Sequence, residues 1–195
     1  TALPVAAAES MVTYEGVEDS LGFAFSHRLP LPSEIGGFGP RRIPSDSIGI
    51  LTTAESALII DERTWSVLYE KSPQEVRSIA SLTKMMTALV LLDEGIDMSS
   101  DITISRADYR AGGVINVFSG EILSTQDVWM IGLIASDNVA VAALVRSTGL
   151  TTEEFVARMN ANAAALGLSS SSFVEPTGID SRNVSTAQDI TKLVA

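Results

Sequence analysis

The sequence contains no cysteine and a single histidine, His27. Without cysteine the chain has no disulfide framework and no thiolate metal site, and one histidine cannot form a multi-histidine metal site. A Ser-His-Asp triad would depend on His27 alone, which lies in a proline-rich stretch. Hydrolytic chemistry in this chain therefore needs a base other than histidine.

Positive charge is also scarce. The 195 residues carry 13 basic and 24 acidic side chains, for a formal net charge of −11. Nucleic acids and anionic membranes need a clustered positive field, so this balance argues against both partners. The longest apolar stretches, near residues 85–92 and 128–135, are well short of the roughly 20 residues of a membrane-spanning helix. We expect one globular domain with a tail and no transmembrane segment.

The first 50 residues hold five of the seven prolines and a glycine-rich run at residues 36–40. This composition interrupts any regular pattern, so we predict an irregular extension over residues 1–50 and the ordered domain over residues 51–195. The small residues 2–8 resemble the end of an export signal or the start of a mature secreted chain, and an arbitrary chain boundary fits them equally well.

Regular patterns begin at residue 56. Two apolar or β-branched runs flank a polar turn, which predicts a β-hairpin. Helical spacing, capping residues and terminal glycines predict four helices, and a further capping sequence predicts another helix start. No internal repeat is present. The predicted hairpin strands are residues 57–60 and 65–69, the helices are 81–92, 124–134, 139–145 and 151–166, and the last start is at 185–189.

The first predicted helix carries apolar residues at the spacing of one helix face, namely Leu82, Met85, Met86, Leu89 and Val90. We expect this face to be buried.

Lys84 is the unusual residue of this helix, because a cation in the first turn opposes the helix dipole. It lies three residues after Ser81, so the amine and the hydroxyl share one helix face. A serine becomes a nucleophile when a base takes its proton, and a lysine can do this if its pKa falls to about 7 or 8. The plainer reading is a capping serine and a surface lysine. With 24 serines and 3 lysines in the sequence, chance gives about 0.4 matches to Ser-x-x-Lys, so the motif alone is weak evidence.

Ser136-Asp137-Asn138 lies in a short polar break between two apolar helices. There a second hydroxyl can relay a proton, and an asparagine amide can orient a substrate. A plain helix-helix turn is the alternative. Ser181-Arg182-Asn183 has the same spacing, but it lies in a polar loop, so we favour the first match.

Together these residues resemble a known family. The hairpin, residues 77–89 with Ser81 and Lys84, and residues 134–140 with Ser136 and Asn138 are similar to the penicillin-binding D-alanyl-D-alanine carboxypeptidases. The similarity continues in the same order through residues 155–160, 166–168, 176–180 and 185–189, and it covers about residues 56–195.

The resemblance implies a mixed α/β (α+β) fold of the serine β-lactamase and transpeptidase type, here a helical subdomain with an incomplete antiparallel sheet. It also implies that Ser81 is the acylated nucleophile, Lys84 its base, Ser136 the proton relay and Asn138 the substrate-binding amide. The implied reaction removes the terminal D-alanine of peptidoglycan stem peptides through an acyl-enzyme, without a metal or an organic cofactor. β-Lactams would acylate Ser81. The implied location is the periplasm or cell envelope, with room for peripheral membrane association through a region after residue 195.

Two departures from the family pattern stand out. The third motif, Lys-Thr-Gly or His-Thr-Gly, is absent, and residues 146–149 are a poor substitute because they follow the second motif too closely. We therefore expect a chain that stops at Ala195 to be a truncated and impaired enzyme. Asp137 replaces the glycine that is commoner in these carboxypeptidases, and class A β-lactamases carry aspartate there.

Two alternatives remain open. One is a class A-like β-lactamase, with Glu175 as the deacylating carboxylate. Residues 177–180 fit the carboxypeptidase loop better, and Glu175 can also be read as a solvated loop carboxylate. The other is a non-catalytic fragment or pseudoenzyme that binds peptidoglycan or a partner chain.

Overall fold

The computed structural model of the protein describes residue 40, residues 49–110 and residues 112–195. His27 and almost all of the predicted N-terminal extension lie outside these residues.

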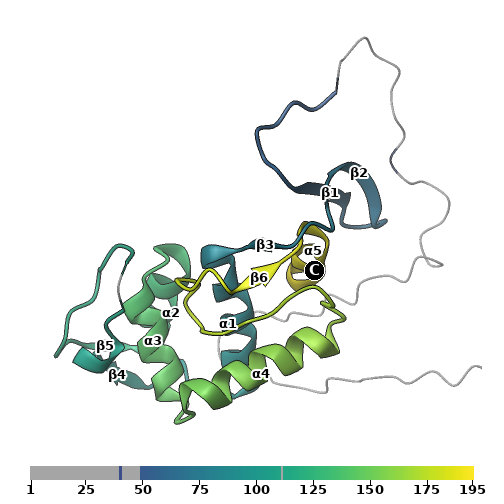
Figure 1. Ribbon diagram of the computed structural model, residues 1–195. Coiled ribbons are helices and arrows are strands. Elements are labelled where there is room, and N and C mark those ends of the chain that lie inside the picture. Colours follow the sequence, from purple (N-terminus) through teal and green to yellow (C-terminus); the bar gives the residue numbers. More distant parts are fainter. Residues whose placement is uncertain (1–39, 41–48, 111) are drawn as a thin grey trace, which may run out of the picture. The chain divides into compact units, whose positions relative to one another are not determined.

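The predicted hairpin is present as β1 (Ala57–Asp61) and β2 (Ser66–Lys71), which pair antiparallel from Ala57 with Lys71 to Asp61 with Ser66. Asp61 closes the turn, because its Oδ1 accepts hydrogen bonds from the backbone N and the Oγ1 of Thr64 at 2.8 and 2.6 Å. Within the described residues this hairpin is one of three two-stranded antiparallel sheets (Figure 1). The other two are β3 (Arg77–Ser78) with β6 (Val184–Ser185), and β4 (Asp101–Thr103) with β5 (Ile122–Ser124).

All four predicted helices are present, and the predicted start near residue 185 leads into a fifth. Ser124 caps α2, since its side chain accepts from the backbone N of Asp127, and Thr151 and Glu154 form a capping box at α4. The α-helices are α1 (Thr83–Asp93), α2 (Thr125–Ile134), α3 (Asn138–Ser147), α4 (Thr152–Ala165) and α5 (Ala187–Val194), and the 3₁₀ turns are η1 (Ala80–Leu82) and η2 (Arg106–Asp108).

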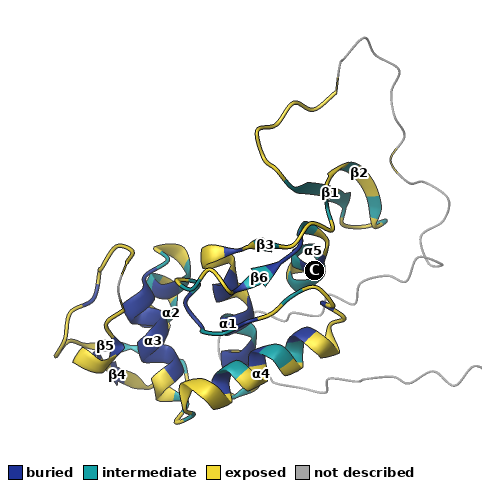
Figure 2. Cartoon of the chain, in the orientation of Figure 1, coloured by how far each residue is buried: buried dark blue, intermediate teal, exposed yellow. Residues whose placement is uncertain are grey.

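The hydrophobic core is built around α3, whose residues from Asn138 to Val145 are all buried (Figure 2). This helix contacts α1, α2 and α4. Phe155 and Met159 of α4 and Met86 and Val90 of α1 are also fully buried in this core. Burying a side chain of this size contributes about 1.5 to 3 kcal/mol each, so the core holds the N-terminal ends of α1 and α3 in fixed positions.

The predicted buried face of α1 is only partly correct. Met86 and Val90 are buried, but Leu82 and Met85 are 45% and 40% exposed. Thr83 and Thr87 are buried instead, because their hydroxyl groups bond to the segment 174–183 that lies against the helix. Polar contacts with this segment, and not apolar spacing alone, decide which side of α1 faces inward.

Candidate active site

Ser81 lies in η1, which leads directly into α1, and the residue is exposed. The preceding residue, Ala80, has a φ of +45°, in the left-handed region that residues with a Cβ rarely occupy. Ser81 does not cap α1, because the N-cap position is Leu82 and no side chain caps it. The reading of Ser81 as a helix cap is therefore wrong.

Lys84 lies on the buried side of α1 and is only 3% exposed. Its Nζ donates to Ser81 Oγ at 3.1 Å, to the Asn138 side-chain oxygen at 2.8 Å and to the Thr177 carbonyl oxygen at 2.7 Å. The reading of Lys84 as a surface lysine is therefore also wrong. The amine therefore connects Ser81 of the Ser-x-x-Lys motif, Asn138 of the Ser-Asp-Asn motif and the segment 174–183.

Burial lowers the pKa of Lys84 below its ordinary value of 10.5, since a buried amine is more stable without its charge. The carboxylates of Glu175 and Asp137 oppose this effect and raise the pKa. Burial is thus the cause that moves Lys84 toward the pKa of a useful general base, and these two acidic side chains limit the shift.

The junction between α2 and α3 brings the second motif to the same place. Ser136 has a φ of +56°, and its Oγ donates to Ser81 Oγ at 3.0 Å. Asp137 is the N-cap of α3, with Oδ1 accepting from the backbone N of Val139 and Ala140 at 2.8 and 3.0 Å. Asn138 is the first residue of α3 and not part of the break, so its side chain is fixed by the helix start.

The structure therefore brings the four predicted site residues, Ser81, Lys84, Ser136 and Asn138, into one hydrogen-bonded group. A cavity of about 730 Å³ adjoins it, with Ser81, Lys84 and Ser136 in its wall. The rest of the wall is apolar and includes Leu82 and Met85, whose side chains are partly exposed there. Its volume is within the range of small-molecule sites.

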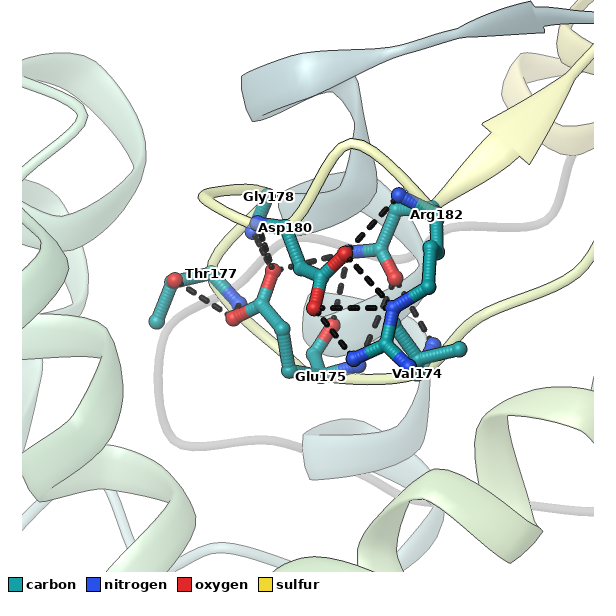
Figure 3. Close-up of polar contacts among 7 residues, drawn as sticks. Val174, Glu175, Thr177, Gly178, Asp180 and Arg182 are labelled. Carbon is teal, nitrogen blue, oxygen red and sulfur yellow. Dashed lines mark hydrogen bonds and ion pairs between the residues drawn. The ribbon is translucent and has the colours of Figure 1, made fainter.

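The sequence did not identify the contribution of residues 174–183. Glu175 is half-buried and is not a solvated loop carboxylate, because its two oxygens accept hydrogen bonds from the backbone N of Thr177 and Gly178 (Figure 3). Asn183 Nδ2 donates a further hydrogen bond to Oε1. Asn183, from the disfavoured Ser-x-Asn match, is completely buried and donates to Thr83 Oγ1 at 3.1 Å. The Pro-Thr-Gly sequence at residues 176–178, a turn signal inside a polar stretch, was the one local indication of this structure.

Residues 146–149 do not reach the group. Arg146 lies near the end of α3 opposite Asn138, about 12 Å away at 1.5 Å per helical residue. Its guanidinium instead pairs with the buried carboxylate of Asp108, with Nε 2.7 Å from Oδ1. Arg146 is thus part of the packing of η2 on α3.

None of the helices in the described residues is both long and apolar enough to cross a bilayer. In the same part of the chain, no group of three or more histidine and acidic side chains is placed to hold a metal ion.

The family model of the D-alanyl-D-alanine carboxypeptidases matches residues 46–195 of the chain. Among curated relatives, the D-alanyl-D-alanine endopeptidase of Pseudomonas aeruginosa is 40% identical over 141 residues, which are 71% of this chain and 46% of the relative. The D-alanyl-D-alanine carboxypeptidase DacF of Bacillus subtilis is 38% identical over 131 residues, 65% of this chain and 34% of the relative. The chain therefore spans less than half the length of these relatives.

Solved structures agree with this match. The D-alanyl-D-alanine carboxypeptidase DacD of Francisella tularensis superposes with a TM-score of 0.69 at 27% identity, over 83% of this chain and 41% of that one. A D-alanyl-D-alanine carboxypeptidase of Mycobacterium tuberculosis gives 0.68 at 28% identity, over 79% and 60%. The mixed α/β fold of the transpeptidase type, expected from the sequence, is confirmed.

Proposed function

Because the chain belongs to the D-alanyl-D-alanine carboxypeptidase family, we propose that it forms the acylating part of a serine-type peptidase. The substrate is the D-alanyl-D-alanine end of a peptidoglycan stem peptide, and the product is the peptide shortened by one D-alanine. The observation that carries this proposal is Ser81 Oγ within hydrogen-bond distance of both Lys84 Nζ and Ser136 Oγ. Residues 51–195 would be the N-terminal part of the catalytic domain, and the family match from residue 46 supports this division.

The proposed acylation uses Lys84 as the base. A neutral amine has two hydrogens and one lone pair. Asn138 and Thr177 provide two acceptors for the hydrogens, so the lone pair is left to face the Ser81 hydroxyl at 3.1 Å. Ser81 Oγ then attacks the carbonyl carbon of the penultimate D-alanine while its proton passes to Lys84 Nζ. A tetrahedral intermediate with one negative oxygen results.

Breakdown of this intermediate needs a proton on the departing amine. Ser136 Oγ lies 3.0 Å from Ser81 Oγ and can pass a proton from Lys84 to the D-alanine nitrogen. The carbon-nitrogen bond breaks, D-alanine leaves and the peptide remains as an ester on Ser81. Water attacks this ester with the same base assistance, which releases the shortened peptide and restores the serine. Asn138, with its nitrogen bonded to the Gly112 carbonyl at 3.1 Å, would orient the substrate amide.

A second candidate activity is endopeptidase cleavage of cross-linked stem peptides. The Pseudomonas aeruginosa relative and the 39% identical Escherichia coli relative are both named D-alanyl-D-alanine endopeptidases. Both reactions break a bond after a D-alanine by the same acyl-enzyme route. Incubation with a monomeric pentapeptide and with a cross-linked dimer separates the two activities. Carboxypeptidase cleavage of the pentapeptide releases free D-alanine, whereas endopeptidase cleavage of the cross-link in the dimer does not.

A β-lactamase role for Glu175 is not favoured. Its two carboxylate oxygens already accept five hydrogen bonds from its own loop and Asn183, so no oxygen is free to activate a water. The pseudoenzyme alternative is weakened by the connected hydrogen bonds of Ser81, Lys84 and Ser136.

The proposed setting is outside the cytoplasm, in the periplasm or cell envelope, because peptidoglycan is the substrate of the proposed reaction. Peripheral membrane association through sequence after residue 195 and a role for residues 1–50 as an extension belong to the same proposal.

Labelling with a fluorescent penicillin tests the function, using the protein with whatever native sequence flanks residues 1–195. We expect a covalent adduct on Ser81 that withstands denaturation and is located by peptide mass spectrometry. Ser81→Ala should give none. An unlabelled wild-type protein, under conditions where the Pseudomonas aeruginosa relative is labelled, would contradict the proposed enzyme.

A further inference from the structure

The carboxylate of Glu175 holds the turn that follows it (Figure 3). Oε2 accepts from the backbone N of Thr177 at 2.7 Å and from its Oγ1 at 2.6 Å. Oε1 accepts from the backbone N of Gly178 at 2.5 Å, from that of Asp180 at 3.4 Å and from Asn183 Nδ2 at 2.8 Å. One side chain thus binds the N–H groups on one side of the turn, which leaves carbonyl oxygens free to point the other way.

Those carbonyl oxygens meet α1. The Pro176 carbonyl accepts from Thr87 Oγ1 at 2.6 Å, and the Thr177 carbonyl accepts from Lys84 Nζ at 2.7 Å. Asn183 adds a third contact through Thr83 Oγ1. Residues 83, 84 and 87 share one side of the helix. The turn is therefore attached to α1 on both sides of the lysine.

Gly178 lies against the peptide bond that precedes the nucleophile. A Cβ on Gly178 would lie 2.0 Å from the Ala80 oxygen and 2.9 Å from the Ser81 nitrogen, and the residue has a φ of +87°. Since no side chain fits there, the turn packs backbone against backbone beside Ser81.

We propose that Glu175 is a positioning residue of the active site, which fixes the Thr177 carbonyl against the Lys84 amine and so directs the lone pair of Lys84 toward Ser81. This inference rests on the proposed acyl-transfer function. Glu175 itself has no hydrogen bond to Lys84 or Ser81; it acts through the turn. The role differs from that of a general base for deacylation.

The charge of Glu175 gives a second, separable effect. Among the described residues, the carboxylates of Glu175 and Asp137 act on Lys84, and both raise its pKa against the effect of burial. The other groups that contact the amine, the Ser81 hydroxyl, the Asn138 amide and the Thr177 carbonyl, are uncharged at neutral pH. Removing the negative charge of Glu175 should therefore lower the pKa of Lys84.

The test is the pH profile of Ser81 acylation by a chromogenic β-lactam, with Glu175→Gln compared with wild type in the protein with its native flanking sequence. We expect the maximal rate to fall about tenfold to a hundredfold, since the turn loses hydrogen bonds to a charged acceptor. The midpoint of the rising limb should move to lower pH. Deacylation should slow no more than acylation does.

Asp180→Asn is the matched control. Asp180 is a carboxylate of the same turn, but its side chain bonds only to Arg182 among the described residues. It should keep the wild-type rate and midpoint. If Asp180→Asn changed the acylation rate and the midpoint as much as Glu175→Gln does, the proposal would be overturned. The loss of any negative charge in this turn would then explain both changes.

Glu175→Asp keeps the proposal testable if the glutamine variant does not fold. The shorter side chain retains the charge but cannot reach all its donors, so the rate should fall while the midpoint stays near that of wild type. A wild-type rate and midpoint in a folded Glu175→Gln protein would overturn the positioning role. Normal acylation with a long-lived adduct would overturn it in favour of a deacylating base. An unlabelled wild-type protein would instead refute the proposed function.

Discussion

The buried amine of Lys84 bonds to three oxygen atoms, and all three belong to uncharged groups, the Ser81 hydroxyl, the Asn138 amide and the Thr177 carbonyl. A buried charge is usually stabilised by an opposite charge at contact distance, because desolvation alone is costly. Polar but uncharged partners favour an amine that exchanges a proton over one that holds it permanently. This arrangement is unfavourable for a structural lysine and suitable for a base.

Replacing Lys84 with methionine tests this directly. The methionine side chain has a length similar to that of lysine, so the helix should remain in Lys84→Met. The variant lacks the base, and the rate of Ser81 acylation should fall about 10² to 10⁴-fold. The variant also leaves the oxygens of Asn138 and Thr177 without a donor, at a cost of about 1 to 3 kcal/mol in unfolding free energy. Stopped-flow acylation and thermal unfolding measure the two effects. An acylation rate close to that of wild type would exclude Lys84 as the base.

The lowered pKa of Lys84 also predicts a pH dependence. Acylation should rise with pH as the amine loses its proton, with a midpoint below the ordinary lysine value of 10.5. Between the lowered pKa of Lys84 in the folded chain and its ordinary value of 10.5, the unfolded chain binds more protons than the folded one. The free energy of unfolding should therefore rise with pH in this interval and stop rising above 10.5. Acylation rates and denaturant midpoints across this range provide the check. A rising limb centred at the ordinary lysine value would show that burial does not act on this amine.

At the scale of secondary structure, the N-terminus of α3 contains both a helix cap and two residues of the candidate site. Asp137 caps the helix through the backbone N of Val139 and Ala140, and its Oδ2 accepts from the backbone N of Asn116 at 2.5 Å. The two neighbouring residues in the chain, Ser136 and Asn138, form hydrogen bonds to Ser81 and Lys84 of the candidate site. The capping residue thus fixes the second motif as well as the helix.

We therefore expect Asp137→Ala to lose about 1 to 2 kcal/mol for the cap and to slow acylation at least about tenfold. Thr151→Ala is the control, since Thr151 caps α4 through Glu154 and, among the described residues, has no hydrogen bond to Ser81, Lys84, Ser136 or Asn138. It should lose about 1 kcal/mol of stability and keep the wild-type acylation rate. Chemical denaturation measures the loss of stability in each variant, and β-lactam labelling measures the acylation rate. Equal acylation in both variants would contradict a link between the cap and the second motif.

The turn after Glu175 allows a second test at this scale. Gly178→Ala introduces a Cβ against the Ala80 carbonyl, and we expect it to push the turn away from Ser81, with a large loss of acylation. Gly167→Ala has a similar φ of +66° but no atom within 4 Å of the new Cβ, so it should cost about 1 to 2 kcal/mol without changing the rate. Labelling rates in both folded variants provide the measurement. A wild-type rate in Gly178→Ala would show that the close packing on Ala80 is unimportant.

The elements that local signals determine were predicted well from the sequence. The hairpin, the caps at Ser124 and Thr151 and the glycine after α4 each depend on a few neighbouring residues. The buried face of α1 was not predicted correctly, since Thr83 and Thr87 face inward only because a segment 89 to 100 residues later provides their hydrogen-bond partners. The short strands β3, β5 and β6 were missed for a different reason, because two or three residues give no periodic pattern.

At the scale of the whole molecule, the candidate site shows the same limit. Ser81, Lys84, Ser136 and Asn138 could be predicted as candidates because the proposed chemistry belongs to their side chains, and the structure brings these side chains together. Thr177 contributes its backbone carbonyl to Lys84, and any residue type has that group, so no sequence pattern can reveal it. Glu175 was noticed as a carboxylate, but its role depends on a turn geometry that only the folded chain displays.

The third family motif is absent from the 195 residues, and this gives the last prediction. By the family resemblance, the strand that carries the third motif is expected to supply one backbone donor to the negative oxygen of the tetrahedral intermediate, and the loss of one such donor typically costs about 10² to 10³ in rate. We expect the 195-residue chain, expressed by itself, to be acylated by a β-lactam more slowly by about this factor than the Pseudomonas aeruginosa relative. The Ser81→Ala variant of the same chain measures the background of labelling that does not occur at Ser81. Equal rates for chain and relative would mean that residues 1–195 provide every donor that the oxyanion needs.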